Sequence, residues 1–141
     1  MHIHTKAVFV ALMLIGFTLA APASAARVVV TVDVSSRTLN VEKDGRELHT
    51  WQISVAKPGY GVPLGRHRLQ SIERGERPST QYGGLMIKPL FFQGDYGIHG
   101  VDLPIGGQVS NGCFHISRSN ANKLYEIVYP NRGSTVVVVK Q

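Results

Sequence analysis

The chain has 141 residues, and its 15 Lys and Arg against nine Asp and Glu give a formal net charge of +6. A basic chain is expected to meet anionic surfaces such as cell-wall polymers, lipid headgroups or nucleic acid. The lack of an arginine-rich run and of zinc-finger spacing argues against nucleic acid as a partner. A solvated basic surface without a specific anion site would explain the charge equally well.

The first 25 residues have the order of a secretory signal. A weakly basic start precedes an apolar run over residues 7–20, and Ala23-Ser24-Ala25 is a small-x-small cleavage site. The run is shorter than the roughly 20 residues that a membrane-spanning helix needs, which leaves an uncleaved anchor as the alternative. We therefore expect a signal peptide over residues 1–25, one exported domain over residues 26–141 in the periplasm or facing the wall, and no stable membrane insertion after cleavage.

The domain is expected to begin with three strands. Glycine is abundant and β-branched residues cluster in short runs, which favours a mostly-β fold. Residues 27–34, 39–43 and 46–55 are the predicted strands. Asp44 and Gly45 form a two-residue hairpin turn between the last two, because such turns demand positive φ angles.

The middle of the chain is more irregular. Residues 57–65 contain two prolines and three glycines and are predicted to form a loop. Residues 67–72 alternate as a strand does, and the polar residues 73–80 are expected to cross the surface. The apolar residues 85–92 contain a proline and are predicted to be an edge strand or an irregular lid. A short strand at 96–99 follows.

One helix is predicted near the C-terminus. Ser119 is the expected N-cap, and residues 130–133 end the helix. Four apolar residues fall on one face at helical spacing: Ala121, Leu124, Tyr125 and Val128. Residues 135–139 are a continuous β-branched run, typical of a buried final strand.

Cys113 is the chain's single cysteine, so it has no partner for an internal disulfide. A nucleophilic cysteine attacks as a thiolate and needs a base or positive potential nearby. His99 lies 14 residues upstream, across a glycine-rich segment that can fold back and bring the imidazole to the sulfur. The sequence therefore suggests Cys113 as nucleophile and His99 as base.

The residues before Cys113 suggest an oxyanion site. Acyl transfer develops a negative oxygen that converging backbone N–H groups stabilise. Gly112 lets the backbone approach a substrate closely, so the amides of Asn111, Gly112 and Cys113 are candidate donors. Ser110 could hold this turn by a side-chain to backbone hydrogen bond.

Two other interpretations of Cys113 stay open. It could be a small buried hydrophobic residue. It could also ligate zinc with His99 and His115, with His67 as an additional ligand, although the chain has no HExxH, CxxC or carboxylate cluster. We expect no metal and no cofactor.

These segments together resemble the L,D-transpeptidase catalytic domain family, called YkuD-like. Residues 32–41 resemble its opening hairpin, and residues 55–65 resemble its glycine-proline loop, with Leu64 in place of the usual threonine. Ile-His-Gly at 98–100 and Ser-Asn-Gly-Cys-Phe at 110–114 match its His-Gly and Ser-x-Gly-Cys signatures. The resemblance covers almost all of the chain after residue 25.

The resemblance implies a mostly-β, β-sandwich-like fold with one main α-helix near the C-terminus. It also implies attack by Cys113 on the third residue of a peptidoglycan stem peptide, with release of the terminal D-alanine and transfer to an amine. His99 would be the base, and the carbonyl of Gly100 would orient its ring. Residues 85–94 would form a wall or lid over the donor, with these aromatic candidates: Phe91, Phe92, Tyr82 and Tyr96. Structural packing explains Tyr82 and Tyr96 equally well.

Two positions depart from the family pattern. His115 stands where many members have arginine, and Asn111 stands where histidine or lysine is common. Both changes lower the positive charge around the thiol. If His115 contacts a substrate carboxylate it would do so only when protonated, which would make activity sensitive to pH.

The sequence and this family resemblance leave three possible functions. The first is a transpeptidase with an amine acceptor. The second is a carboxypeptidase or amide hydrolase that uses water with the same acyl-enzyme, and the third is a non-catalytic wall-binding module with the same fold. The sequence carries no acceptor motif and does not indicate an oligomeric state.

Overall fold

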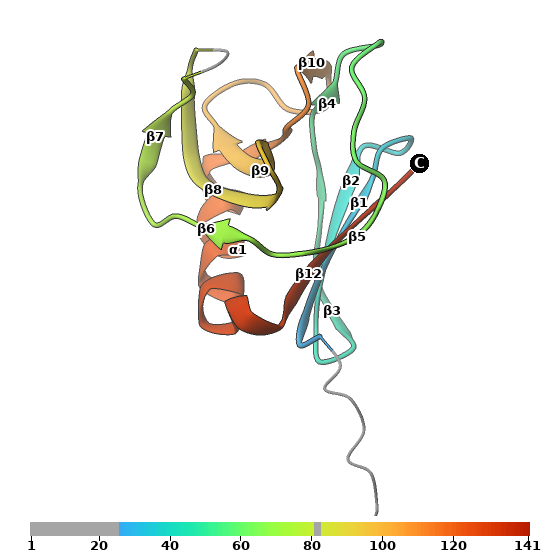
Figure 1. The fold of residues 1–141 in the computed structure, drawn as a ribbon, viewed down its shortest axis with the longest axis vertical. Coiled ribbons are helices and arrows are strands. Elements are labelled where there is room, and N and C mark those ends of the chain that lie inside the picture. The colour runs from blue at the N-terminus through green and yellow to red at the C-terminus, as the bar shows by residue number, and fades with distance from the viewer. Residues whose placement is uncertain (1–25, 81–82) are drawn as a thin grey trace, which may run out of the picture.

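The computed structural model describes residues 26–80 and 83–141, so the predicted signal at 1–25 and the wall candidate Tyr82 lie outside the described residues. In the part of the chain that it describes, the fold has two five-stranded sheets, a short two-stranded sheet and one α-helix (Figure 1). The mostly-β, sandwich-like prediction is confirmed. No helix in the described ranges is long and apolar enough to cross a membrane.

The first sheet joins the two ends of the domain. Its order is β3-β2-β1-β12-β5, and β1 runs parallel to β12 with Val28 opposite Thr135. The strands are β1 (Val28–Asp33), β2 (Thr38–Lys43), β3 (Arg46–Gln52), β5 (Gly65–Arg68) and β12 (Thr135–Lys140). Asp44 and Gly45 make the predicted hairpin turn, with φ angles of 50° and 76°.

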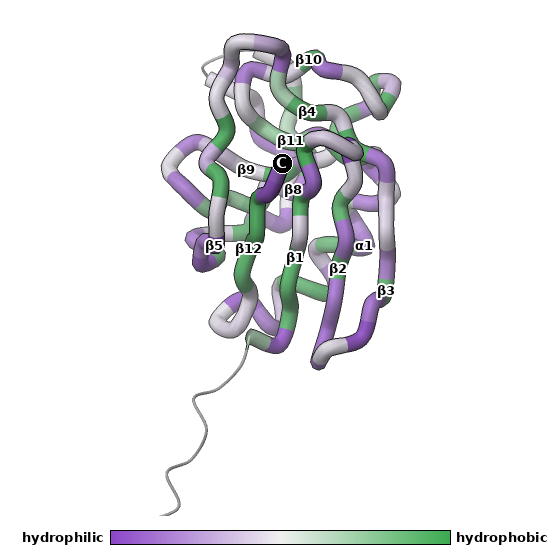
Figure 2. Tube along the Cα trace, turned by 90° about the vertical axis from the view of Figure 1, so that its right-hand side faces the viewer, coloured by the Kyte–Doolittle hydropathy of each residue, from purple (hydrophilic) through white to green (hydrophobic). Residues whose placement is uncertain are grey.

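Alternation places one face of this sheet in the core. Val28, Val30 and Val32 are fully buried, and the residues between them are partly exposed. Figure 2 shows the hydrophobic strands β1 and β12 at the middle of the sheet and the hydrophilic β3 at its edge. The valine-rich strands β1 and β12 thus lie inside the sheet, where each has a neighbouring strand on both sides.

The second sheet carries the helix and the central part of the chain. Its order is β11-β9-β8-β6, and β7 also pairs with β8. The strands are β6 (Ser71–Ile72), β7 (Glu76–Pro78), β8 (Leu85–Gln93), β9 (Tyr96–Val101) and β11 (Phe114–Ser117). The helix α1 (Arg118–Val128) packs on this sheet, and both sheets and the helix share one hydrophobic core.

Two predicted strands are each divided in the structure. The strand predicted at 46–55 becomes β3 and β4 (Val55–Ala56), because the chain leaves the first sheet at Ile53 and pairs β4 with β10 (Gln108–Ser110). The strand predicted at 67–72 likewise becomes β5 and β6, which belong to different sheets. Local alternation does not show where a strand changes partners.

The prediction that residues 85–92 form an edge strand or an irregular lid was wrong. β8 lies inside the sheet, with β9 on one side and β6 and β7 on the other. Pro89 is tolerated because it falls at an irregularity between Ile87 and Leu90, where Lys88 has a φ of 46° and donates its N–H to the carbonyl of Gly75. Residues 76–78, predicted to cross the surface, form β7.

The helix prediction was right for its buried face and wrong for its cap. The four residues predicted to share a face are all buried. The N-cap is Ser117 instead of Ser119, because the Ser117 hydroxyl accepts the backbone N–H of Asn120 at 3.2 Å. A 3₁₀ helix (Tyr129–Ser134) follows Val128 and leads into β12.

Candidate active site

A cavity of about 780 Å³ lies over β9 and the segment that enters β11. Cys113, His99 and His115 all line it. The neighbouring residues predicted from the sequence line it as well: Tyr96, Ser110, Asn111 and Gly112. Residues that are up to 19 positions apart in the sequence therefore meet at one concave surface.

Strand pairing brings the cysteine and the histidine to the same cavity. β9 and β11 are parallel, and His99 lies directly opposite His115. Cys113 directly precedes β11, whose first residue, Phe114, lies opposite Ile98. Cys113 and His99 thus come from adjacent chain segments, and both line the cavity.

The glycine-rich return from β9 to Cys113 is anchored to the segment that links the two large sheets. Arg37 Nη1 donates to the carbonyl of Gly106 at 2.8 Å, and the Gly106 N–H donates to Ser54 Oγ at 3.0 Å. The Val55 N–H donates to the carbonyl of Gly107 at 2.9 Å. Sequence reasoning assigned no role to Arg37 or Ser54, although both hold the return loop by hydrogen bonds to Gly106.

Ser110 closes the turn that carries the thiol. Its hydroxyl is buried, accepts the Gly112 N–H at 3.2 Å and donates to the carbonyl of Cys113. The predicted use of the Gly112 amide as an oxyanion donor is therefore not supported, because that N–H is already engaged. The amides of Asn111 and Cys113 are the remaining candidates.

Two glycines are required by close packing. Gly112 has a φ of 144°, and a Cβ there would lie 2.9 Å from the ring of Tyr96, which forms the wall beside the nucleophile. A Cβ on Gly100 would lie 2.7 Å from Cβ of Ala121 on the helix and 2.9 Å from Cβ of Ile87. Gly100 thus has a packing role besides the carbonyl role that the sequence suggested.

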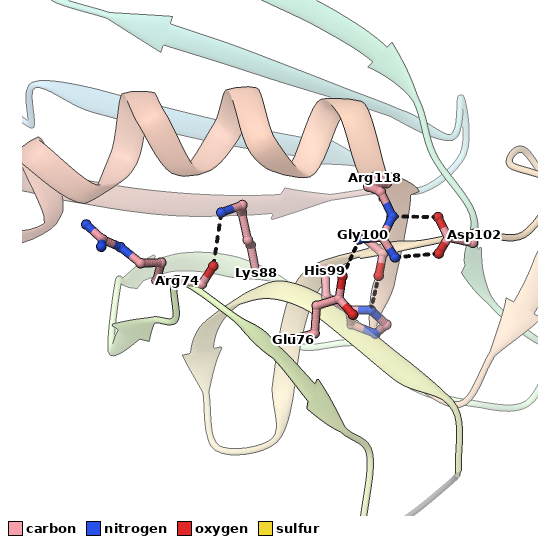
Figure 3. Close-up of polar contacts among 7 residues, drawn as sticks. All are labelled: Arg74, Glu76, Lys88, His99, Gly100, Asp102 and Arg118. Atoms are coloured by element: carbon pink, nitrogen blue, oxygen red, sulfur yellow. Dashed lines mark hydrogen bonds and ion pairs between the residues drawn. The ribbon is translucent and has the colours of Figure 1, made fainter.

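The backbone beside His99 selects its tautomer. Nδ1 lies 3.1 Å from the carbonyl of Gly100, which can only accept, so Nδ1 carries the proton and Nε2 is left as an acceptor (Figure 3). His99 is 7% exposed, and burial lowers the pKa of its imidazole, which the Gly100 carbonyl partly offsets. The ring is therefore neutral near pH 7, and its Nε2 can accept a proton.

The thiol is also held in its neutral form. Burial raises the pKa of Cys113, the backbone N–H of Gly97 lowers it, and the charge of Asp95 raises it. Sγ donates weakly to the carbonyl of Asp95 at 3.5 Å. The resting site is therefore a neutral thiol and a neutral imidazole, and proton transfer has to accompany attack. Asp95 has no family motif around it and was missed.

His115 does not provide the positive charge that an arginine would. Its ring centroid lies 4.7 Å from that of His99, and burial followed by repulsion from His99 lowers the pKa of His115 to about 4. The ring is uncharged near neutral pH, which removes the expected source of pH sensitivity there. Lys57, which the sequence reasoning missed, supplies a cation instead, because its Nζ donates to Oδ1 of Asn111 at 3.3 Å and it lines the cavity.

An ion-pair cluster borders the site at the start of the helix. Arg118 makes two hydrogen bonds to Asp102, at 2.6 and 2.9 Å, and a third to Glu76 (Figure 3). Asp102 follows β9 and lines the cavity, and Glu76 belongs to β7. The cluster joins three elements around the cavity and neutralises Asp102.

The predicted aromatic wall is only partly present. Phe92 is 2% exposed and stacks on Phe114 in the core, and Phe91 lies under the guanidinium of Arg77, so neither lines the cavity. At the end of β8 burial alternates, with Leu90 and Phe92 buried and Phe91 only partly buried, so Phe92 points inward. The ends of the predicted segment 85–94 do line the cavity, through Leu85, Met86, Ile87, Gln93 and Gly94.

The zinc alternative has no complete ligand set here. His67 bonds to the carbonyl of Pro63 at 2.9 Å and is not among the residues lining the cavity. Within residues 26–80 and 83–141, no three His, Cys, Asp or Glu side chains lie close enough to hold a metal ion.

Comparisons with known proteins agree on one family. The family model described as the L,D-transpeptidase catalytic domain, YkuD, matches residues 27–139. An L,D-transpeptidase from Mycobacterium tuberculosis H37Rv is similar at 27% identity and a TM-score of 0.70, over 82% of this chain and 58% of that one. One from Xylanimonas cellulosilytica is similar at 25% identity and a TM-score of 0.71, over 84% and 63%.

A third structure, an Enterococcus faecium L,D-transpeptidase carrying a cysteine-to-serine mutation, shares the fold at 22% identity and a TM-score of 0.70, over 82% of this chain and 50% of that one. The chain thus spans less than two thirds of the length of these structures. No curated protein matches it.

Proposed function

Because the chain belongs to the L,D-transpeptidase catalytic domain family, we propose that it is an exported acyltransferase that acts on peptidoglycan stem peptides. The observation that carries this proposal is that Cys113, which directly precedes β11, and His99, on the adjacent parallel strand β9, line one cavity. The tautomer of His99 leaves Nε2 as the acceptor for the thiol proton.

The first step is acylation of Cys113. His99 Nε2 takes the proton of the thiol while Sγ attacks the carbonyl carbon of the third stem residue. The oxyanion is stabilised by the backbone amides of Asn111 and Cys113, and Lys57 adds positive potential beside them. His99 then gives its proton to the leaving amine, the C–N bond breaks, and the terminal D-alanine departs with a thioester left on Cys113.

The second step returns the thiol. An amine attacks the thioester carbonyl, its excess proton passes to His99, and the C–S bond breaks. Water in the place of the amine gives a hydrolase with the same intermediate. The wall substrate lies outside the cytoplasm, which supports export and the assignment of residues 1–25 as a signal peptide.

A mass measurement tests the acylation step. A solved LD transpeptidase of the same fold is in complex with imipenem, and this carbapenem serves as the probe. We expect purified protein to gain the mass of one imipenem on Cys113. Cys113→Ala should gain none, and His99→Asn, which keeps a donor toward the Gly100 carbonyl and removes the base, should react at least about 100-fold more slowly.

Product analysis then separates the functions that share the fold. With a tetrapeptide stem as donor and acceptor, dimers joined through third residues support transfer, whereas shortened monomers alone would make the protein a hydrolase. No adduct on the wild-type protein, together with binding to sacculi that Cys113→Ala retains, would replace the enzyme by a wall-binding module.

A further inference from the structure

Asp95 is a charged residue beside the nucleophile that the acylation step does not use. It lies in the tight turn between β8 and β9, next to Gly94, and both residues line the cavity. Its carbonyl oxygen is 3.5 Å from Sγ of Cys113. Asp95 therefore lines the site with a negative charge that raises the pKa of the Cys113 thiol.

The carboxylate of Asp95 has no partner among the residues that the structure describes. Across residues 26–80 and 83–141, no ion pair or side-chain hydrogen bond engages it. The other carboxylate that lines the cavity, Asp102, is neutralised by Arg118. Lys57 is occupied with Asn111, on the segment before the nucleophile.

An unpaired carboxylate at this place disfavours acylation. Negative charge near a thiol opposes its ionisation, and it also opposes the oxyanion that forms on the substrate. The two histidines do not offset it, because His99 and His115 are neutral near pH 7, and Lys57 lies on the Asn111 side of the cavity. The charge is explained if a cation binds to it at a later step of the reaction.

We propose that Asp95 is a specificity-determining residue that holds the primary ammonium group of the acceptor beside the thioester on Cys113. The inference rests on the proposed function and names its acceptor class: amines that are cationic in solution. By raising the local concentration of the amine, Asp95 favours transfer over attack by water.

The chemistry of the transfer balances with this role. The acceptor enters as R–NH₃⁺ and loses one proton to His99, which passes it to solvent. The free amine forms the C–N bond, the C–S bond breaks, and the second proton moves through His99 to the departing sulfur. The products are the amide, the Cys113 thiol and one released proton.

The test measures how the thioester divides between transfer and hydrolysis. A tetrapeptide donor is supplied with D-alanine amide, which carries an ammonium group and no carboxylate, or with hydroxylamine, which is uncharged at neutral pH. Asp95→Asn should lower the ratio of transfer to hydrolysis for D-alanine amide by about twofold to fivefold, the upper part of the range for an exposed ion pair. The ratio for hydroxylamine should not change.

Two control variants and a salt titration show whether the effect depends on the charge of Asp95. Asp95→Glu keeps the charge and should keep most of the ratio, and Glu126→Gln removes an exposed carboxylate on the helix, outside the cavity, and should have no effect. In the wild-type protein, added NaCl should lower the ratio for D-alanine amide and leave that for hydroxylamine unchanged.

Equal effects on both nucleophiles, an unchanged ratio in Asp95→Asn, or a ratio for D-alanine amide that does not respond to salt would each overturn the role of Asp95. Failure of the wild-type protein to form the imipenem adduct would overturn the proposed function instead, so the two failures are distinguishable.

Discussion

The two large sheets differ in how regularly their strands pair. In the first sheet, β1 pairs with β2 and with β12 over six consecutive positions without a shift. In the second sheet, the register between β8 and β9 shifts twice, and β6 and β7 are two and three residues long. The candidate site lies on the irregular sheet, its loops and the adjoining two-stranded sheet of β4 and β10.

The two sheets therefore contribute differently: the first mainly to the stability of the fold and the second mainly to the positions of the candidate site residues. The first sheet supplies continuous apolar burial, and no residue of its strands lines the large cavity. The second sheet accommodates bulges, close glycine contacts and side-chain anchors, which aim individual groups at one point. Mutations in the two sheets should therefore have separable effects on unfolding and on acylation.

The largest effect on stability is expected from Val30→Ala in β1. The side chain is fully buried in the regular sheet, and its truncation should lower the free energy of unfolding by about 2–3 kcal/mol. Urea unfolding measures the loss, and the imipenem acylation rate per folded molecule should not change. Thr31→Ala, on the partly exposed face of the same strand, is the control and should cost less than about 1 kcal/mol.

Gly100→Ala should destabilise the second sheet by about 1–3 kcal/mol, because its Cβ has to displace Ala121 and Ile87. It should also slow acylation, since His99 hydrogen-bonds to this residue's carbonyl. Gly75→Ala is the matched control, with nothing within 4 Å of the added Cβ. Wild-type stability and acylation in Gly100→Ala would show that the helix does not rest tightly on β9.

Ser110→Ala should lower the free energy of unfolding by about 1–2 kcal/mol, since it removes one partner from each of two backbone groups in the nucleophile turn. Acylation should fall by at least about tenfold, because the turn that aims the thiol is no longer closed. Ser117→Ala removes the helix cap at a similar cost of about 1 kcal/mol. If both variants slowed acylation equally, the turn would have no special role.

The smallest effect is a pH dependence of stability. The pKa of His115 falls from 6.5 unfolded to about 4 folded, and that of His99 is also lowered, so the unfolded chain binds more protons between these values. Stability should be complete above about pH 6.5 and decline as the pH falls toward 4. Partial exposure of the His115 ring reduces its share to about 1–2 kcal/mol.

Thermal unfolding at a series of pH values measures this decline, and His115→Gln should remove the part due to His115. The carboxylates Asp33 and Asp102, whose pKa values are lowered by hydrogen bonds, lose their stabilisation only at more acidic pH, so the two windows separate. If the stability of His115→Gln fell between pH 6.5 and 4 as steeply as that of the wild-type protein, the His115 ring would not be buried in its neutral form.

The amino-acid sequence by itself determined the features that depend on near neighbours in the chain. Alternating valines predicted the buried face of β1, helical spacing predicted the buried face of α1, and Asp44-Gly45 predicted the hairpin turn. The same local patterns led to Cys113 and His99, because glycines and a serine surround both in recognisable motifs.

Only the tertiary structure decided which distant groups meet. It placed β8 inside its sheet, turned Phe92 into the core and engaged the Gly112 amide with Ser110. It also brought Lys57 and Asp95 to the cavity, two residues for which the sequence indicated no role. Hydrogen-bond partners and electrostatic fields act through space, so their pattern does not follow from the order of residues along the chain.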